Sequence, residues 1–79
     1  MGYHMREIQK GTLGEISKVQ EEVDEFKDAL EQSNKVLQMC ELCDIYGALE
    51  ALARSYGLSM KDLQKMSDRT VSAFSDGSR

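Results

Sequence analysis

The chain of 79 residues carries 10 lysines and arginines against 14 aspartates and glutamates, a net charge of −4, and has no proline. Its length allows one small domain, and its 41% apolar and 30% charged residues exclude a disordered or fibrous chain. The negative charge argues against a nucleic-acid partner, and no apolar run reaches the roughly 20 residues of a membrane span. We therefore expect a cytoplasmic all-α protein that binds neither nucleic acid nor membrane.

The amino-terminal third predicts an arm followed by a helix. Residues 1–11 show no hydrophobic period, so we expect an extended arm in which His4 is exposed. Thr12 and Glu15 have the spacing of a capping box, and apolar residues then recur every three or four positions. These signals predict an amphipathic helix over residues 12–32, ended by a polar turn.

A second helix is predicted over residues 35–56, and it is apolar on almost every side. Thirteen of the eighteen residues in 36–53 are apolar, so this helix must be covered from several directions. Cys40 and Cys43 lie inside it without further zinc ligands nearby, and we expect them to be small, buried packing residues. Because two other short helices cannot cover such a surface, we expect a homo-oligomeric helical bundle, a dimer or a tetramer.

The third predicted helix, over residues 60–75, carries basic side chains. Ser59 and Asp62 have the spacing of a second capping box. Lysines and an arginine then follow at steps of four, which places them in one stripe of the helix surface. Such a stripe suits a polyphosphate, so we expect substrate-binding residues here: Lys61, Lys65 and Arg69.

Two acidic pairs carry the strongest functional signal. Glu22 and Glu25 lie beside the apolar stripe of the first helix, and Glu41 and Asp44 lie within the apolar surface of the second. Buried carboxylates need compensation by a basic side chain, a shared proton or a metal ion. Fifteen residues separate Glu25 from Glu41, so an antiparallel hairpin would bring both pairs to the same height. Four converging carboxylates form an all-oxygen site suited to Mg²⁺ or Mn²⁺, and the absence of a nearby histidine argues against zinc or di-iron.

These acidic pairs resemble the signature of a known superfamily. Glu21-Glu22-x-x-Glu25 followed by Glu41-x-x-Asp44 is similar to the motif of the all-α nucleoside triphosphate pyrophosphatases, the MazG-like superfamily. The segments 10–15 and 65–69 are similar as well, so the resemblance covers residues 8–79. It implies hydrolysis of ribo- or deoxynucleoside triphosphates to the monophosphate and pyrophosphate.

The resemblance also implies roles for individual residues. The metal, Mg²⁺ or alternatively Mn²⁺, would be held by Glu22, Glu25, Glu41 and Asp44. Glu21 and Glu22 would be the catalytic residues, with Glu21 orienting or deprotonating the attacking water. Asp68 departs from the asparagine expected at its position. Two alternatives stay open, namely a non-catalytic helical oligomerisation or binding module with a vestigial metal site, and an activity on phosphoribosyl-ATP.

Overall fold

The computed structural model describes residues 4–76, which form three helices and an amino-terminal arm. The helices are α1 (Ile16–Glu31), α2 (Lys35–Ser55) and α3 (Met60–Asp76). No strand is present in residues 4–76, which agrees with the predicted all-α class. Within the same residues, no helix is long and apolar enough to cross a membrane.

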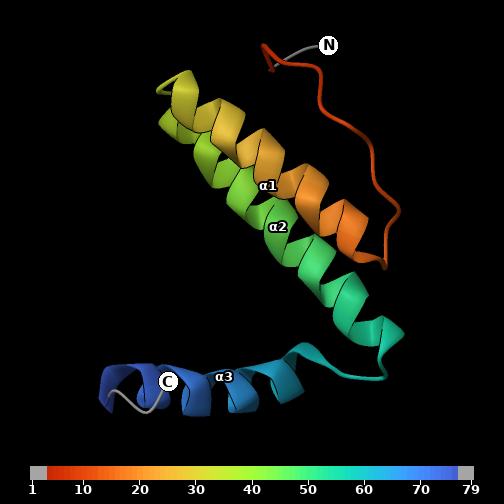
Figure 1. Ribbon diagram of the computed structural model, residues 1–79, viewed down its shortest axis with the longest axis vertical. Helices are drawn as coiled ribbons and strands as arrows, with labels where there is room; N and C mark the ends of the chain where they lie inside the picture. The colour runs from red at the N-terminus through yellow and green to blue at the C-terminus, as the bar shows by residue number, and fades with distance from the viewer. Residues whose placement is uncertain (1–3, 77–79) are drawn as a thin grey trace.

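Helices α1 and α2 form an antiparallel hairpin, the main body of the molecule (Figure 1). A tight turn joins them, in which Ser33 adopts the left-handed conformation with φ of 54°. The Ser33 N–H donates to the Leu30 carbonyl and the Asn34 N–H to the Ala29 carbonyl, which closes the end of α1. The side chain of Asn34 then accepts from the N–H of Leu37 and caps α2. This turn aligns the two acidic pairs at one height.

The predicted capping box at the start of α1 does not form, and the helix begins at Ile16 rather than residue 12. Gly14 has φ of +93°, which interrupts the helical path. Residues 12–15 make a turn instead, closed by the N–H of Glu15 on the carbonyl of Thr12. Glu15 is the N-cap and makes no side-chain capping bond.

Residues 4–15 form an arm that runs back along α1, antiparallel to it (Figure 1). The N–H of Gly11 donates to Glu21 near the start of α1, and the N–H of Met5 donates to Asp28 near its end. A Cβ at residue 11 would lie 2.2 Å from the backbone oxygen of Ser17. Only glycine therefore allows the arm to approach the helix so closely.

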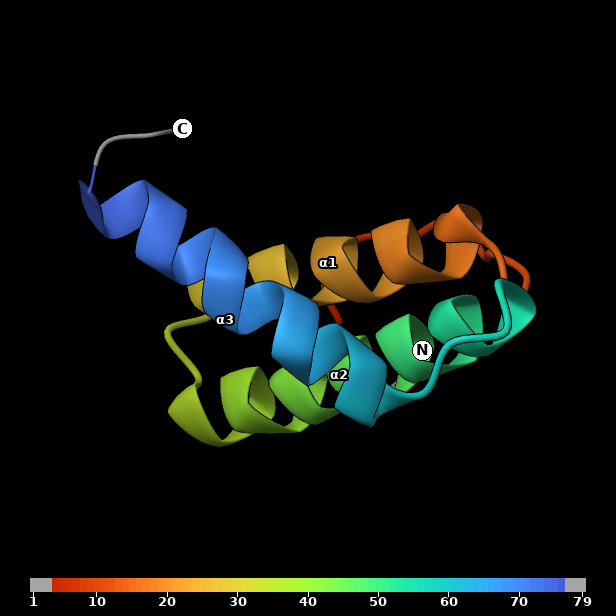
Figure 2. The same ribbon diagram turned by 90° about the horizontal axis from the view of Figure 1, so that it is seen from below.

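Helix α3 leaves the hairpin at a steep angle and contacts only the end of α2 (Figures 1 and 2). Gly57, with φ of +78°, follows the end of α2, and the Leu58 N–H donates to the carbonyl of Ala53. The predicted capping box of α3 forms, because Ser59 and Asp62 exchange backbone-to-side-chain hydrogen bonds of 2.9 and 3.1 Å.

The described core is small and half of it is charged. Among the residues whose side chains are described, four apolar and four acidic residues are buried: Ala29, Leu37, Ala48, Ala53, Glu21, Glu22, Asp28 and Glu41. Much of the apolar surface of α2 stays exposed, for example Val36 at 73% and Tyr46 at 58%. Cys40 and Cys43 are exposed too. Their predicted burial is therefore wrong for a single chain, because neither α1 nor α3 covers that side of α2.

Candidate metal centre

Four carboxylates from facing helices converge in the middle of the hairpin. Glu22 and Glu25 come from α1, and Glu41 and Asp44 come from α2. Each offers one oxygen, and these oxygens all lie within 4.8 Å of one another. The i, i+3 spacing places both members of each pair on one face of their helix, and the short turn brings the two faces together. The structure thus brings together all four residues predicted to hold a metal.

Two of these carboxylates are buried with an oxygen that lacks a partner. Glu22 is 5% exposed and Glu41 is 4% exposed. Glu22 Oε1 and Glu41 Oε2 have no hydrogen-bond partner among the described residues. A buried oxygen without a donor is costly, and carboxylate oxygens are the preferred ligands of Mg²⁺ and Mn²⁺. The donor set therefore fits a hard divalent cation.

The pKa values of two members of the acidic cluster are raised. Burial and the neighbouring carboxyl groups of Glu41 and Glu22 raise the pKa of Glu25 to about 7. Burial likewise raises the pKa of Glu41, with Asp44 adding to the effect and Glu25 and His4 opposing it. Charge repulsion in a poorly solvated site is the common cause. A divalent cation would favour the ionised forms of both groups.

The adjacent Glu21 lies in a different environment, outside this cluster. Its Oε1 accepts from the Gly11 N–H at 2.8 Å and from Lys18 Nζ at 3.1 Å, while Lys10 Nζ lies 3.5 Å from Oε2. Burial alone would raise the pKa of Glu21, but these donors outweigh it and lower the pKa. Lys18 Nζ also lies 3.0 Å from Glu22 Oε2 and so links Glu21 to the edge of the cluster.

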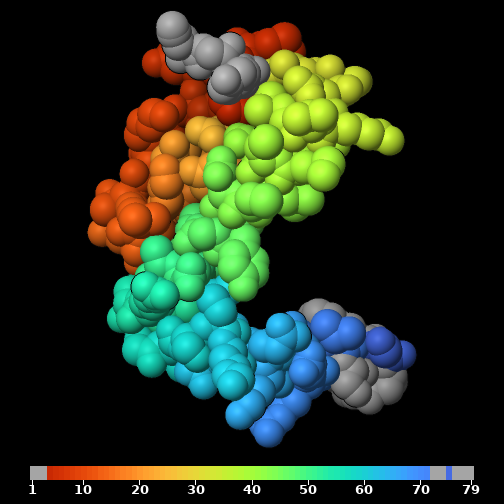
Figure 3. All heavy atoms as spheres, turned by 180° about the vertical axis from the view of Figure 1, so that it is seen from behind, coloured from red at the N-terminus to blue at the C-terminus, as the bar shows by residue number. Residues whose placement is uncertain are grey.

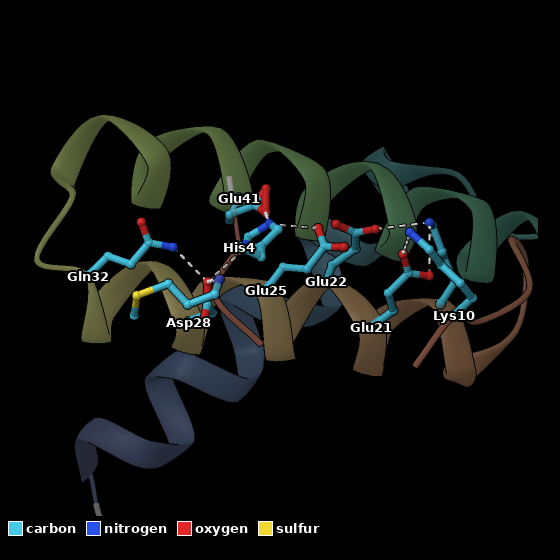
Figure 4. A network of polar contacts seen from close by, with 10 residues as sticks. His4, Lys10, Glu21, Glu22, Glu25, Asp28, Gln32 and Glu41 are labelled. Carbon is cyan, nitrogen blue, oxygen red and sulfur yellow. Dashed lines mark hydrogen bonds and ion pairs between the residues drawn. The ribbon is translucent and has the colours of Figure 1, made fainter. Parts of the chain in front are cut away.

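His4 lies in the site, so the expectation that it is an exposed arm residue is wrong (Figure 4). Its side chain is 17% exposed, and Nδ1 lies 2.9 Å from Asp28 Oδ2. Nε2 lies 3.2 Å from Glu41 Oε2 and 3.7 Å from Glu25 Oε1. Burial would lower the pKa of His4, but the hydrogen bond to Asp28 and the charges of Glu25 and Glu41 raise it.

A cleft of about 640 Å³ opens beside this cluster, bordered by the arm and both helices of the hairpin. Its lining combines acidic and apolar side chains: His4, Glu25, Asn34, Val36, Leu37, Cys40, Glu41 and Asp44. The acidic residues can hold a cation, which can in turn bind an anionic group, and the neighbouring apolar side chains can contact an uncharged ring of the same ligand.

The family of the chain follows from a match to a protein-family model described as phosphoribosyl-ATP pyrophosphohydrolase, over residues 3–70. The match covers well over half of the chain. The chain belongs to the phosphoribosyl-ATP pyrophosphohydrolase family. Comparisons with curated proteins and with solved structures found no match.

Membership confirms the resemblance to the MazG-like superfamily, to which this family belongs. The chain is accordingly a pyrophosphohydrolase, an enzyme that hydrolyses phosphoric anhydrides. Pyrophosphohydrolases of this family generally use a divalent metal, and the acidic cluster of this chain offers a place for one.

The structure does not bring the predicted basic residues of this pyrophosphohydrolase to the cluster. The three lie on α3, are exposed, and do not line the cleft: Lys61, Lys65 and Arg69. Helix α3 contacts the hairpin only through α2 and points away from it (Figure 1). Within one chain, the acidic site and the basic stripe are therefore separate.

Sequence reasoning missed His4 and Asp28. Asp28 follows Glu25 at the spacing that separates Glu22 from Glu25, so α1 places all three on related faces. That continuation of the acidic row was the one local signal for Asp28. For His4 the only signal was composition, since it is the single histidine of the chain.

Proposed function

We propose that the chain hydrolyses the triphosphate of a nucleotide between its α- and β-phosphates, with Mg²⁺ as cofactor, and releases pyrophosphate. The convergence of four carboxylates, two of which have a buried oxygen without a hydrogen bond, carries this proposal. The family description favours phosphoribosyl-ATP as substrate. The acidic motif itself is equally compatible with ribo- or deoxynucleoside triphosphates, which present the same triphosphate.

The cofactor would be held by Glu22, Glu25, Glu41 and Asp44, with Mn²⁺ as an alternative to Mg²⁺. Bound there, such a cation neutralises phosphate charge and lowers the pKa of coordinated water. The chain contributes by orienting its ligands. Lys18 holds Glu22 by Oε2, which leaves Oε1 for the cation, while Glu41 is fixed by its burial in the hairpin.

We retain Glu21 and Glu22 as the proposed catalytic residues, with distinct contributions. Glu22 would contribute as a ligand of the metal ion. Glu21 lies one position earlier, stays ionised because its donors lower its pKa, and shares Lys18 with Glu22. A proton acceptor must be ionised to work, so the environment of Glu21 is compatible with the proposed role in orienting the attacking water.

We further propose that a second copy of the chain completes the site, in a dimer or a tetramer. Exposed apolar residues of α2, among them Met39, Leu42 and Tyr46, need a cover. An additional groove of about 480 Å³ lies between α2 and α3, and the space-filling view shows the surface hollowed there (Figure 3). In such an assembly α3 of one subunit can bring Lys65 and Arg69 to the cleft of another.

Subunit mixing tests this shared site. Light scattering coupled to size-exclusion chromatography should give a dimer or tetramer. Glu41→Gln subunits and Lys65→Ala/Arg69→Ala subunits should each be inactive alone and regain part of the activity when mixed, because mixed assemblies contain one intact site. A monomer, or an inactive mixture of confirmed mixed oligomers, would contradict the shared site.

Product analysis tests the reaction itself. The chain would be incubated with phosphoribosyl-ATP and with a panel of ribo- and deoxynucleoside triphosphates, with Mg²⁺ or with EDTA. We expect pyrophosphate and the matching monophosphate in equal amounts, and only when the metal is present. The rate of pyrophosphate release should be highest with the true substrate. Asp44→Asn should abolish this release while the helical circular dichroism signal is preserved. Release of single phosphate, or no release from any substrate, would refute the proposal and favour a non-catalytic module.

A further inference from the structure

The imidazole of His4 is held in one orientation by a buried anchor. Asp28 is 1% exposed, and its Oδ2 lies 2.9 Å from His4 Nδ1. The same oxygen accepts from Gln32 Nε2 at 2.7 Å and from the Met5 N–H at 3.1 Å, so Asp28 is itself fixed. A carboxylate on one imidazole nitrogen keeps the proton there and leaves the lone pair on the other, which is the arrangement found around metal-bound histidines.

The other imidazole nitrogen, Nε2, points toward the carboxylate oxygens of the acidic cluster. It lies 3.2 Å from Glu41 Oε2 and 3.7 Å from Glu25 Oε1. The contact with Glu41 is not aligned as a hydrogen bond, since Oε2 of this buried side chain has no such partner among the described residues. Nitrogen and oxygen ligands at about 2.1 Å from one cation lie roughly 3–3.5 Å apart. The Nε2–Glu41 distance falls in this range and the Nε2–Glu25 distance is slightly longer, while His4, Glu25 and Glu41 each offer one ligand atom within 4.8 Å of the others.

We infer that His4 is a nitrogen ligand of the divalent cation held by Glu25 and Glu41, with Asp28 as the residue that orients it. The inference rests on the metal site of the proposed function and adds the arm to that site. It also changes the expected metal preference, because imidazole favours Mn²⁺ or Co²⁺ over Mg²⁺ relative to an all-oxygen site. The arm then becomes part of the metal centre, and its docking is coupled to metal binding.

The rival role for His4 is that of a positive charge that substitutes for the metal and leaves when the metal binds. The two roles predict opposite effects of removing the side chain. A ligand strengthens metal binding, so its loss weakens affinity. A substitute competes with the metal, so its loss strengthens affinity. Metal binding by the full chain therefore separates them without any measurement of activity.

Pulsed electron paramagnetic resonance of bound Mn²⁺ tests the ligand directly. Because His4 is the only histidine, tag-free full-length chain can be prepared with ¹⁵N-histidine and compared with unlabelled chain. We expect ¹⁴N modulation from a directly bound imidazole in the unlabelled sample, replaced by ¹⁵N coupling in the labelled one. Bound Mn²⁺ without histidine coupling would overturn the inference. This readout uses the wild-type chain, so it does not depend on the folding of a variant.

Titration with Mn²⁺ and with Mg²⁺ gives the second readout. His4→Ala should weaken Mn²⁺ binding by roughly 10–100-fold and Mg²⁺ binding much less. Met5→Ala is the matched control, since Met5 is 69% exposed and bonds Asp28 only through its backbone N–H, and it should bind both ions like wild type. Tighter Mn²⁺ binding by His4→Ala would overturn the inference. Wild-type chain that binds neither ion would refute the metal site of the proposed function as well, whereas binding without histidine coupling would refute only the role of His4.

Discussion

Glu21 and Glu25 lie about one turn apart on α1, both shielded from solvent, yet their ionisation is shifted in opposite directions. Around Glu21, the Gly11 N–H and Lys18 donate to the carboxylate, and its pKa is lowered. Around Glu25, the nearest groups include the carboxyls of Glu41 and Glu22, and its pKa is raised to about 7. The first region satisfies its charge with nearby donors, whereas in the second the carboxyl groups outnumber the single imidazole of His4. One helix therefore carries an acid whose ionised form is stabilised by nearby donors and an acid whose ionised form is destabilised by its surroundings.

The largest expected effect is the loss of metal binding when a cluster carboxylate is neutralised. Glu41→Gln removes a buried ligand without changing its shape, and should weaken Mg²⁺ binding by roughly 100-fold. Isothermal titration calorimetry would measure the affinity. Glu50→Gln is the control, because Glu50 is on the same helix but pairs with Arg54 at the surface. Equal affinities for the two variants would contradict the assignment of the cluster.

Removing one charge from each region should change stability in opposite directions in EDTA at pH 8. Glu21→Gln should lower the free energy of unfolding by roughly 1–3 kcal/mol, because the Gly11 N–H and Lys18 lose a buried, charged acceptor. Glu25→Gln should raise it by roughly 1–3 kcal/mol, because the cost of burying a charge and the repulsion by Glu41 and Glu22, which together raise the Glu25 pKa, disappear. Urea unfolding followed by circular dichroism measures both. Changes of the same sign would show that the two environments do not differ as described.

The pH dependence of the free energy of unfolding should be determined mainly by the region around Glu25. A carboxyl whose folded pKa is raised stabilises the fold below its unfolded pKa, and this contribution is lost as pH rises through the folded pKa. For Glu25 the window runs from 4.5 to about 7, and the raised pKa of His4 acts in the same direction. The lowered pKa values of Glu21 and Asp28 matter only in more acidic solution.

We therefore expect the metal-free chain to unfold at a lower temperature at pH 8 than at pH 5. Saturating Mg²⁺ should reverse this order, because metal binding requires ionised carboxylates. Differential scanning calorimetry in EDTA and in Mg²⁺ gives the comparison, and Glu25→Gln should flatten the dependence in EDTA. A metal-free chain that gains stability between pH 5 and pH 8 would count against the raised pKa values.

The smallest effect concerns the turn that aligns the two acidic pairs. Ser33 has φ of 54°, a conformation that glycine adopts without strain. Ser33→Gly should therefore raise the free energy of unfolding by about 0.5–1 kcal/mol. Metal affinity should stay unchanged, since Ser33 contacts neither region. Denaturant unfolding and calorimetry test the two parts, and a loss of stability would show that strain at Ser33 is relieved by contacts within the turn.

The three helices and the convergence of the carboxylates were predictable because their causes are local. Apolar periodicity predicted α1, a long apolar segment predicted α2, and a capping box predicted the start of α3. The short connection between α1 and α2 fixed the height at which Glu25 meets Glu41. The late start of α1 was not predictable from a capping-box pattern, because the conformation of Gly14 decides between a turn and a helix.

The position of His4 was beyond local reasoning. Its contact with Asp28 joins residues 24 apart in sequence through a segment without periodic pattern. The direction of α3 could not be predicted from the sequence for a related reason. Apolar residues recur along one face of this helix, at Leu63, Met66 and Val71. The pattern shows that the face must be covered but does not say whether its own hairpin or another chain covers it.

The arm also has a consequence for how relatives can vary. Its anchors on α1, Glu21 and Asp28, are seven residues apart, about 10 Å along a helix. The six residue steps from Met5 to Gly11 span about 20 Å when extended. The arm is therefore longer than its path requires, and insertions or deletions of a residue between the anchors need not displace the imidazole.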